Sequence, residues 1–165
     1  MQLIKKYGPY VSIGLIVLVL GLLFLPYVRG GDANAYYANG YTAIFNIKDS
    51  ALPSTITNKG GPSVLLIIAF VLMVLSLIGL PFHKKDSVIA LLAGIALCIS
   101  GLIFLLAHLV LYINLRMAAV NATFPLYLIA VLVSAAGAIS LLVGIKNLKD
   151  DYLASINSHH SYIRK

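Results

Sequence analysis

The chain has 165 residues, of which 61% are hydrophobic and 10% are charged, and its mean hydropathy is +0.98. This composition leaves no room for a soluble catalytic domain. The formal net charge of +7 does not require a nucleic-acid partner, because basic residues in membrane proteins concentrate in cytoplasmic loops. We therefore expect one membrane domain, residues 1–165, without nucleic acid as a partner.

Four long apolar runs account for most of the chain. They cover residues 10–28, 63–82, 88–112 and 126–145, and none contains Asp, Glu, Lys or Arg. Each has about the 20 residues that a helix needs to cross a hydrocarbon core ~30 Å thick. Backbone N–H and C=O groups in the hydrocarbon core find no water, so in these runs only helices can provide their hydrogen-bond partners. The sequence predicts an all-α membrane protein, a four-helix transmembrane bundle with an outer loop at 29–62 and a tail at 146–165.

The basic residues predict the orientation of this bundle. Eight lie on one predicted side of the membrane and four on the other. The larger set is Lys5, Lys6, Lys84, Lys85, Lys146, Lys149, Arg164 and Lys165; the smaller is Arg29, Lys48, Lys59 and Arg116. The excess places both termini in the cytoplasm. Lys5, Lys6, Lys84, Lys85, Lys146 and Lys149 would then contact anionic lipid headgroups.

Small residues recur at seven-residue intervals inside the runs. The positions are Gly14 and Gly21, Ala69 and Ser76, Gly94 and Gly101, and Gly137 and Gly144. A seven-residue repeat keeps residues on one seam of a left-handed supercoil, and small side chains let membrane helices approach closely. We predict a left-handed, tightly packed bundle, although glycine and alanine are also common in membrane helices for other reasons.

The outer loop 29–62 is rich in aromatic residues. Tyr36-Tyr37-Ala38 and Tyr41–Phe45 flank Asn39-Gly40, a pair that favours a type I′ turn, so a short β-hairpin is expected. The competing interpretation is a short interfacial helix around Tyr41–Ile47. In either case Tyr36, Tyr37, Tyr41 and Phe45 are candidate partner-binding residues, because interfaces favour aromatic anchors.

Apart from Cys98 and the tyrosines, one ionisable side chain lies within the runs. His108 shares a helix edge with Tyr112 and Asn114, and an intramembrane ionisable residue suggests a functional site. A proton-handling or ligand-binding role is one interpretation; a neutral histidine hydrogen-bonded to a neighbouring helix is the other. The chain contains no Glu. We find no pattern that predicts a catalytic centre, a metal site or a cofactor.

The tail 146–165 carries a helical apolar pattern. Leu148, Tyr152 and Ile156 are spaced four residues apart. This spacing suits a cytoplasmic helix that lies on the membrane or docks on a partner. A solvated extension of the fourth helix is the alternative.

Two resemblances follow from the layout and from short motifs. The order of spans and loops resembles that of claudin-type tetraspan proteins, but the outer loop lacks their Trp and two Cys. The motifs Phe24-Leu25-Pro26 and Gly40-Tyr41-Thr42-Ala43-Ile44-Phe45 are similar to those of small four-span membrane proteins of Gram-positive bacteria. The first resemblance implies outward interaction through the loop, and the second implies no activity.

These observations predict a non-enzymatic protein of a bacterial plasma membrane. We expect an accessory or assembly subunit that binds other membrane proteins, or further copies of itself, through its helices and outer loop. The alternative is a small transporter or an oligomeric channel subunit with a path near His108.

Overall fold

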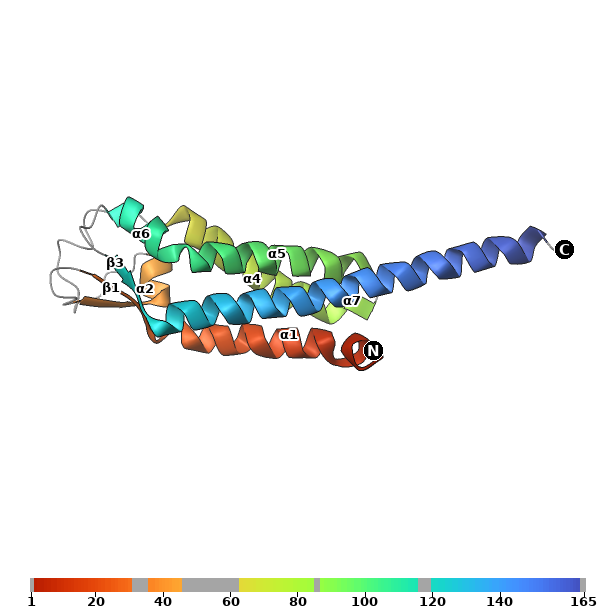
Figure 1. Cartoon of the computed structure of the whole chain (residues 1–165), viewed down its shortest axis with the longest axis horizontal. Helices are drawn as coiled ribbons and strands as arrows, with labels where there is room; N and C mark the ends of the chain where they lie inside the picture. Colours follow the sequence, from red (N-terminus) through yellow and green to blue (C-terminus); the bar gives the residue numbers. More distant parts are fainter. Residues whose placement is uncertain (1, 31–35, 46–62, 85–86, 116–119, 164–165) are drawn as a thin grey trace.

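The structure, a computed structural model, describes residues 2–30, 36–45, 63–84, 87–115 and 120–163. Four helices in these ranges are long and apolar enough to cross a membrane, and they form one elongated bundle (Figure 1). They are α1 (Gln2–Leu22), α4 (Val64–Gly79, continued by the 3₁₀ turn η2, Leu80–Lys84), α5 (Ser87–Leu105) and α7 (Phe124–Ile163). The predicted four-helix transmembrane bundle is confirmed.

The helix ends differ from the ends of the apolar runs. Helix α1 begins at Gln2 rather than at residue 10 and ends at Leu22, so that residues 26–28 lie in a strand. The third run is divided at Leu106 into α5 and a short α6 (Ala107–Leu115). Helix α7 continues past Ile145 to Ile163. Apolar composition follows the thickness of the hydrocarbon core, whereas a helix can continue into water or end within an apolar stretch.

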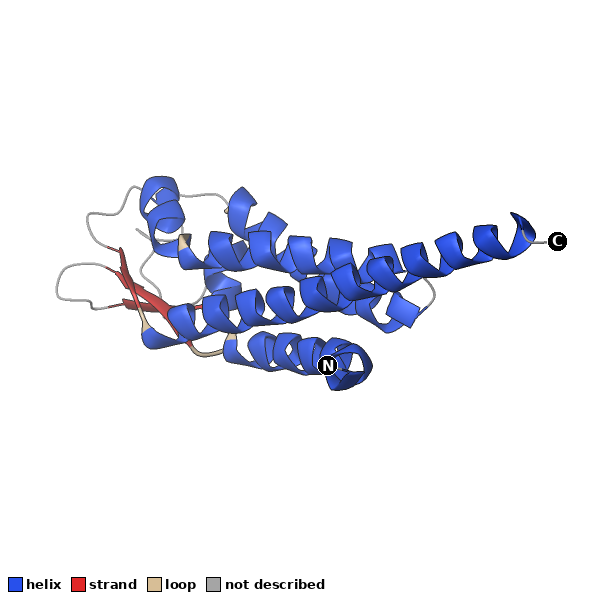
Figure 2. Cartoon of the chain, turned by 45° about the vertical axis from the view of Figure 1, so that its right-hand side comes forward, coloured by secondary structure: helices blue, strands red, loops and turns tan. Residues whose placement is uncertain are grey.

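Helices α5 and α7 form the centre of the bundle. Helix α7 packs along α5 on one side and along α1 on another, and α4 packs against α5. Both chain termini lie at the same end, and the last part of α7 projects beyond the other helices (Figures 1 and 2). We call this the tail end, and the opposite end, which carries the strands, the sheet end.

Glycines bring α5 and α7 into backbone contact. A Cβ atom added to Gly94 would lie 2.6 Å from the backbone nitrogen of Leu141, and one added to Gly137 would lie 2.9 Å from that of Cys98. Gly144 is restricted in the same way by the Leu91 backbone nitrogen at 2.5 Å, and a Cβ atom on Gly101 would meet Ser134, whose backbone nitrogen would lie 3.1 Å away. Four of the predicted small-residue positions therefore form one α5–α7 contact, in which a larger side chain would push the helices apart.

The prediction for the first helix is wrong. A Cβ atom on Gly14 or Gly21 would meet nothing within 4 Å, and both residues are exposed. Helix α1 instead packs against α7 through Gly8, whose added Cβ would lie 2.8 Å from Val143. Ser12 follows on the same buried face. The seven-residue repeat of glycines in α1 thus falls on the side that faces away from the bundle.

Serine hydroxyls link the helices inside the bundle. Ser12 Oγ donates to the carbonyl oxygen of Ala136 at 3.0 Å, and Ser140 Oγ donates to Ser12 Oγ at 3.0 Å. Ser100 Oγ donates to the carbonyl oxygen of Ala69 at 2.8 Å and thereby joins α5 to α4. These hydroxyls are buried, and interhelical bonds of this kind each contribute about 0.6 kcal/mol in membrane proteins.

The sheet end carries a small antiparallel sheet. Its strands are β1 (Pro26–Gly30), β2 (Tyr36–Asn39) and β3 (Val120–Ala122), in the order β2-β1-β3. Strand β1 follows α1 and β3 precedes α7, so the sheet joins the ends of two helices that pack together. The expectation of a short β-hairpin is confirmed by the β1–β2 pair, but the expected second arm, Tyr41–Phe45, is helical and its place is taken by β1.

The position of the expected turn is corrected. Asn39 ends β2, and Gly40 begins the short helix α2 (Gly40–Phe45), so Asn39-Gly40 is not a hairpin turn between two strands. The Asn39 side-chain oxygen accepts a hydrogen bond from the Thr42 backbone N–H at 2.8 Å. This is the geometry of a helix N-cap, which asparagine favours. The alternative prediction, a short helix around Tyr41–Ile47, is confirmed for residues 41–45, and residues 46 and 47 lie outside the described ranges.

Thr123 fastens the sheet to the start of α7. Its Oγ1 lies 2.6 Å from the carbonyl oxygen of Pro26 and 2.7 Å from that of Tyr27, so its one proton can serve either acceptor. The backbone N–H of Thr123 also donates to the Tyr27 carbonyl oxygen at 3.3 Å. The strand after α1 is therefore held against the first turn of α7.

Candidate functional site

Four aromatic rings form a contiguous cluster where α1, α2 and α4 meet. The ring centroids of Phe24 and Tyr41 are 4.7 Å apart, those of Tyr41 and Phe70 are 6.1 Å apart, and those of Phe45 and Phe70 are 5.3 Å apart. The last two pairs are edge-to-face, which is a favourable arrangement for aromatic rings. We call these four residues the aromatic cluster.

The outer members of the aromatic cluster are open to their surroundings. Phe24 is 70% exposed and Phe45 is 37% exposed, whereas Tyr41 and Phe70 are half-buried. The cluster thus has a supported base and two exposed rings. Rings in this arrangement can contact a partner protein or the lipid headgroup region with little loss of conformational freedom.

The backbone around α2 fixes the position of Tyr41. The Gly40 N–H donates to the Leu23 carbonyl oxygen at 2.7 Å, and a Cβ at Gly40 would lie 3.0 Å from that same oxygen. The close approach requires glycine. The Tyr41 hydroxyl donates to the carbonyl oxygen of Leu20 at 3.0 Å, close to the end of α1. The two bonds tie α2 to the last turn of α1 and to the residue that follows it.

Burial affects the phenol of Tyr41 as well. Desolvation raises the pKa of Tyr41 above its ordinary value, because removal from water disfavours the phenolate. The phenol, which is protonated at neutral pH in any tyrosine, therefore remains a donor to Leu20 further into the alkaline range.

Beneath the sheet lies a buried phenol of a different kind. Tyr27 in β1 is fully buried, and its ring meets Phe104 of α5 edge-to-face with centroids 6.5 Å apart. Within the described part of the chain its hydroxyl has no hydrogen-bond partner. Desolvation raises the pKa of Tyr27 well above its ordinary value. This side chain anchors the sheet on the bundle through its ring.

The aromatic cluster contains only part of the predicted loop site. Tyr41 and Phe45 belong to it. Tyr36 and Tyr37 lie in β2, and their side chains fall outside the described residues. Sequence reasoning did not assign Phe24 and Phe70 to the site. Phe24 lies near the end of the first apolar run, in the motif Phe24-Leu25-Pro26, which is a usable signal, but Phe70 is indistinguishable from other residues of an apolar run.

The polar intramembrane site remains a prediction. His108, Tyr112 and Asn114 lie in α6, but the placement of their side chains is outside the described part of the structure. Among the described residues, no group of three or more His, Cys, Asp or Glu side chains comes together.

Four of the basic residues predicted to contact lipid have described side chains, and all four lie at the tail end. Lys5 forms an ion pair with Asp150, and the Lys6 ammonium lies 5.3 Å from the centre of the Tyr7 ring. Lys146 is half-buried and Lys149 is exposed, both on α7. The side chain of Lys84 and the whole of Lys85 lie outside the described residues.

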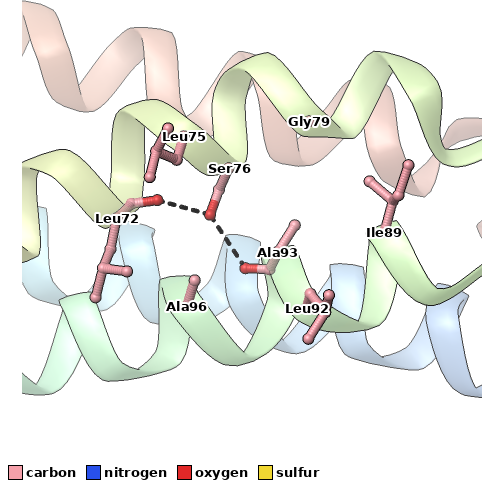
Figure 3. A pocket seen from close by; sticks show the side chains of 8 residues that line it. All are labelled: Leu72, Leu75, Ser76, Gly79, Ile89, Leu92, Ala93 and Ala96. Carbon is pink, nitrogen blue, oxygen red and sulfur yellow. Dashed lines mark hydrogen bonds between the residues drawn. The ribbon is translucent and has the colours of Figure 1, made fainter.

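A groove of about 230 Å³ runs between α4 and α5 (Figure 3). It is lined by Leu72, Leu75, Ser76, Gly79, Ile89, Leu92, Ala93 and Ala96. The Ser76 hydroxyl is directed at the carbonyl oxygens of Leu72, at 2.8 Å, and Ala93, at 3.3 Å. Because the Ser76 hydroxyl donates its proton within the protein, the groove offers a ligand almost only apolar contacts. It is suited to an acyl chain rather than to a polar substrate.

Comparisons with known proteins do not assign a family. No family model matches the sequence, and no curated protein matches it.

Proposed function

We propose that this chain is a non-enzymatic accessory or assembly subunit that binds another membrane protein through the aromatic cluster at its sheet end. The observation that carries the proposal is a set of four mutually packed rings, of which Phe24 and Phe45 are exposed. Interfaces favour such rings because they bury a large area at a small entropic cost. The hydrogen bonds of Gly40 and Tyr41 to α1 support preorganisation of the cluster.

The proposed membrane is the plasma membrane of a bacterium, with the tail end in the cytoplasm. Lys5, Lys6, Lys146 and Lys149 at the tail end support this orientation, because cytoplasmic ends of membrane helices carry the excess of basic residues. At the sheet end, described β1 carries one such residue, Arg29. In this orientation the aromatic cluster lies near the outer surface. The bacterial source is proposed from the resemblance of the loop motifs.

The test is purification of the tagged, full-length chain from its native membrane in mild detergent. The proposal expects a second membrane protein in stoichiometric amount. It also expects the double variant Phe24→Ala/Phe45→Ala to lose that protein. Phe124→Ala is the matched control, because Phe124 is 76% exposed at the start of α7 and lies outside the cluster.

Two results would contradict the proposal. One is a particle that contains only this chain. The other is a partner that both the double variant and the Phe124→Ala control retain. If the rings only position the protein in the headgroup region, the variants will change stability without changing the composition of the particle.

A further inference from the structure

The outward face of α7 carries a second seven-residue repeat, which the glycine contacts do not use. One set of positions recurs every seven residues and consists of Val131, Ala138, Ile145 and Tyr152. A second set lies four residues after the first and consists of Ala135, Leu142, Lys149 and Ile156. We call these eight positions the α7 seam. Exposed fractions are 61% for Val131, 50% for Leu142, 56% for Ile145, 67% for Tyr152 and 36% for Ile156.

The other two faces of α7 are already occupied. Gly137 and Gly144 face α5. Val143 and Ser140 face α1, where they contact Gly8 and Ser12. Contacts to both neighbouring helices therefore leave the α7 seam pointing away from the bundle over its whole length.

Lipid can cover only part of this seam. Asp150 pairs with Lys5 near the start of α1, so the neighbouring helix ends near the level of Asp150. Beyond that level α7 projects alone (Figures 1 and 2). At a rise of 1.5 Å per residue, Tyr152 and Ile156 lie about 10 and about 16 Å past Ile145. Exposed apolar side chains on the seam thus continue from the hydrocarbon core into water.

A partner for the seam must meet three requirements. It must be helical, because an apolar repeat of alternating four and three residues matches a second helix in a left-handed coiled coil. It must cross the membrane beside α7, and it must project from the same side over the same length. Copies of one chain in a membrane share their orientation, so α7 of a second copy meets all three requirements with each residue at the height of its equivalent.

We propose that two copies of this chain associate in parallel along the α7 seam. Leu148 and Leu153 flank the seam at positions where parallel coiled coils bring side chains of the two helices together. Leu153 is 46% exposed in the single chain. The contact lies at the tail end and along the membrane span, remote from the aromatic cluster, so it is independent of the proposed function.

Lys149 lowers the stability of the proposed dimer. It is the one charged residue of the α7 seam and occupies a core position of the repeat. A single lysine at such a position lowers stability but fixes the register of the two helices. Near the membrane surface its ammonium can reach lipid phosphates along its flexible stem. Removal of this charge should therefore strengthen the dimer.

Disulfide cross-linking of the full-length chain in membrane vesicles tests the geometry. The native thiol is removed first by Cys98→Ala. A disulfide requires Cβ atoms about 3.8 Å apart, so Tyr152→Cys and Ile156→Cys should form covalent dimers on mild oxidation. Asp151→Cys and Ala154→Cys, which lie off the seam, should not. Equal cross-linking at all four positions, or none at any, would overturn the proposal; a tail lying on the bilayer or covered by a foreign protein would give none.

A second measurement does not depend on cysteine chemistry. Purified, fluorescently labelled protein in vesicles is counted by single-molecule photobleaching at low protein density. Ile156→Glu should weaken dimerisation at least about tenfold, because two copies in register would bury two like-charged carboxylates at the same height of the seam. Ala154→Glu should have little effect, and Lys149→Leu should increase the dimeric fraction. Purely monomeric wild-type protein, or equal behaviour of the two Glu variants, would refute the proposal.

Discussion

Replacement of Gly94 by alanine is the sharpest test of how the bundle is held together. The added methyl would lie 2.6 Å from the Leu141 backbone nitrogen and 3.0 Å from the Gly137 carbonyl oxygen, and ordinary contact begins at 3.4 Å. Both obstacles are backbone atoms, so no side-chain rotation relieves them. Helices α5 and α7 must separate by about 0.8 Å, the difference between 3.4 and 2.6 Å.

The cost of this separation is distributed over the whole α5–α7 contact. A gap of about 0.5–1 Å already removes a quarter to a half of the dispersion energy of each contact pair. Overpacking of this kind typically costs about 1–3 kcal/mol, and the better helix propensity of alanine returns up to about 1 kcal/mol. We expect Gly94→Ala to lower the free energy of unfolding by about 1–2 kcal/mol.

The same chain supplies the control. A Cβ atom at Gly14 meets nothing within 4 Å. Gly14→Ala should therefore leave stability unchanged or raise it by up to about 1 kcal/mol through helix propensity. Both variants are unfolded by increasing the proportion of sodium dodecyl sulfate in mixed micelles, and helicity is followed by circular dichroism. Gly94→Ala as stable as Gly14→Ala would refute the close α5–α7 contact.

Four further predictions follow from single contacts, each measured by the same unfolding titration. Tyr27→Phe should keep or raise stability, by up to about 1–3 kcal/mol, because it removes a buried hydroxyl without a described partner; a clear loss would reveal a partner. Ser12→Ala should cost about 0.6–1.7 kcal/mol, because it removes both the bond to Ala136 and the bond from Ser140; a loss no larger than that of a substitution at an exposed position would argue against these bonds. Thr123→Val should cost about 1 kcal/mol, and no loss would argue against its bonds to β1. Because the pKa of Tyr27 is raised in the folded state, its proton is retained where the unfolded phenol ionises. Stability should therefore fall as pH rises above about 10, and Tyr27→Phe should remove this part of the pH dependence.

Sequence reasoning located what the bilayer dictates. Charge-free runs of about 20 residues identify membrane helices because no other backbone arrangement is tolerated in lipid. The seven-residue repeat of small residues also predicts correctly that the glycines of α5 and α7 lie in a helix contact. The repeat of Gly14 and Gly21 gave the same pattern on a face of α1 that contacts nothing. Periodicity identifies a face of a helix, but only the arrangement of the other helices decides whether that face is buried.

The sheet end was harder to predict. Asn39-Gly40 favours both a type I′ turn and a capped helix start. The choice between them depends on the Gly40–Leu23 contact, which joins distant parts of the chain. Strand β3 lies almost a hundred residues from its partner β1, and its three residues carry no strand pattern. Phe70 joins the aromatic cluster through the position of α4 rather than through any local signal.

Site-specific photo-cross-linking in the native membrane tests the proposed function most directly. A benzophenone amino acid is placed at Phe45 in the aromatic cluster and, as the control, at Phe124. The account predicts a discrete adduct between position 45 and a second membrane protein, with no such adduct from position 124. Adducts with lipid alone at both positions, or only with another copy of this chain, would contradict a partner-binding role for the aromatic cluster.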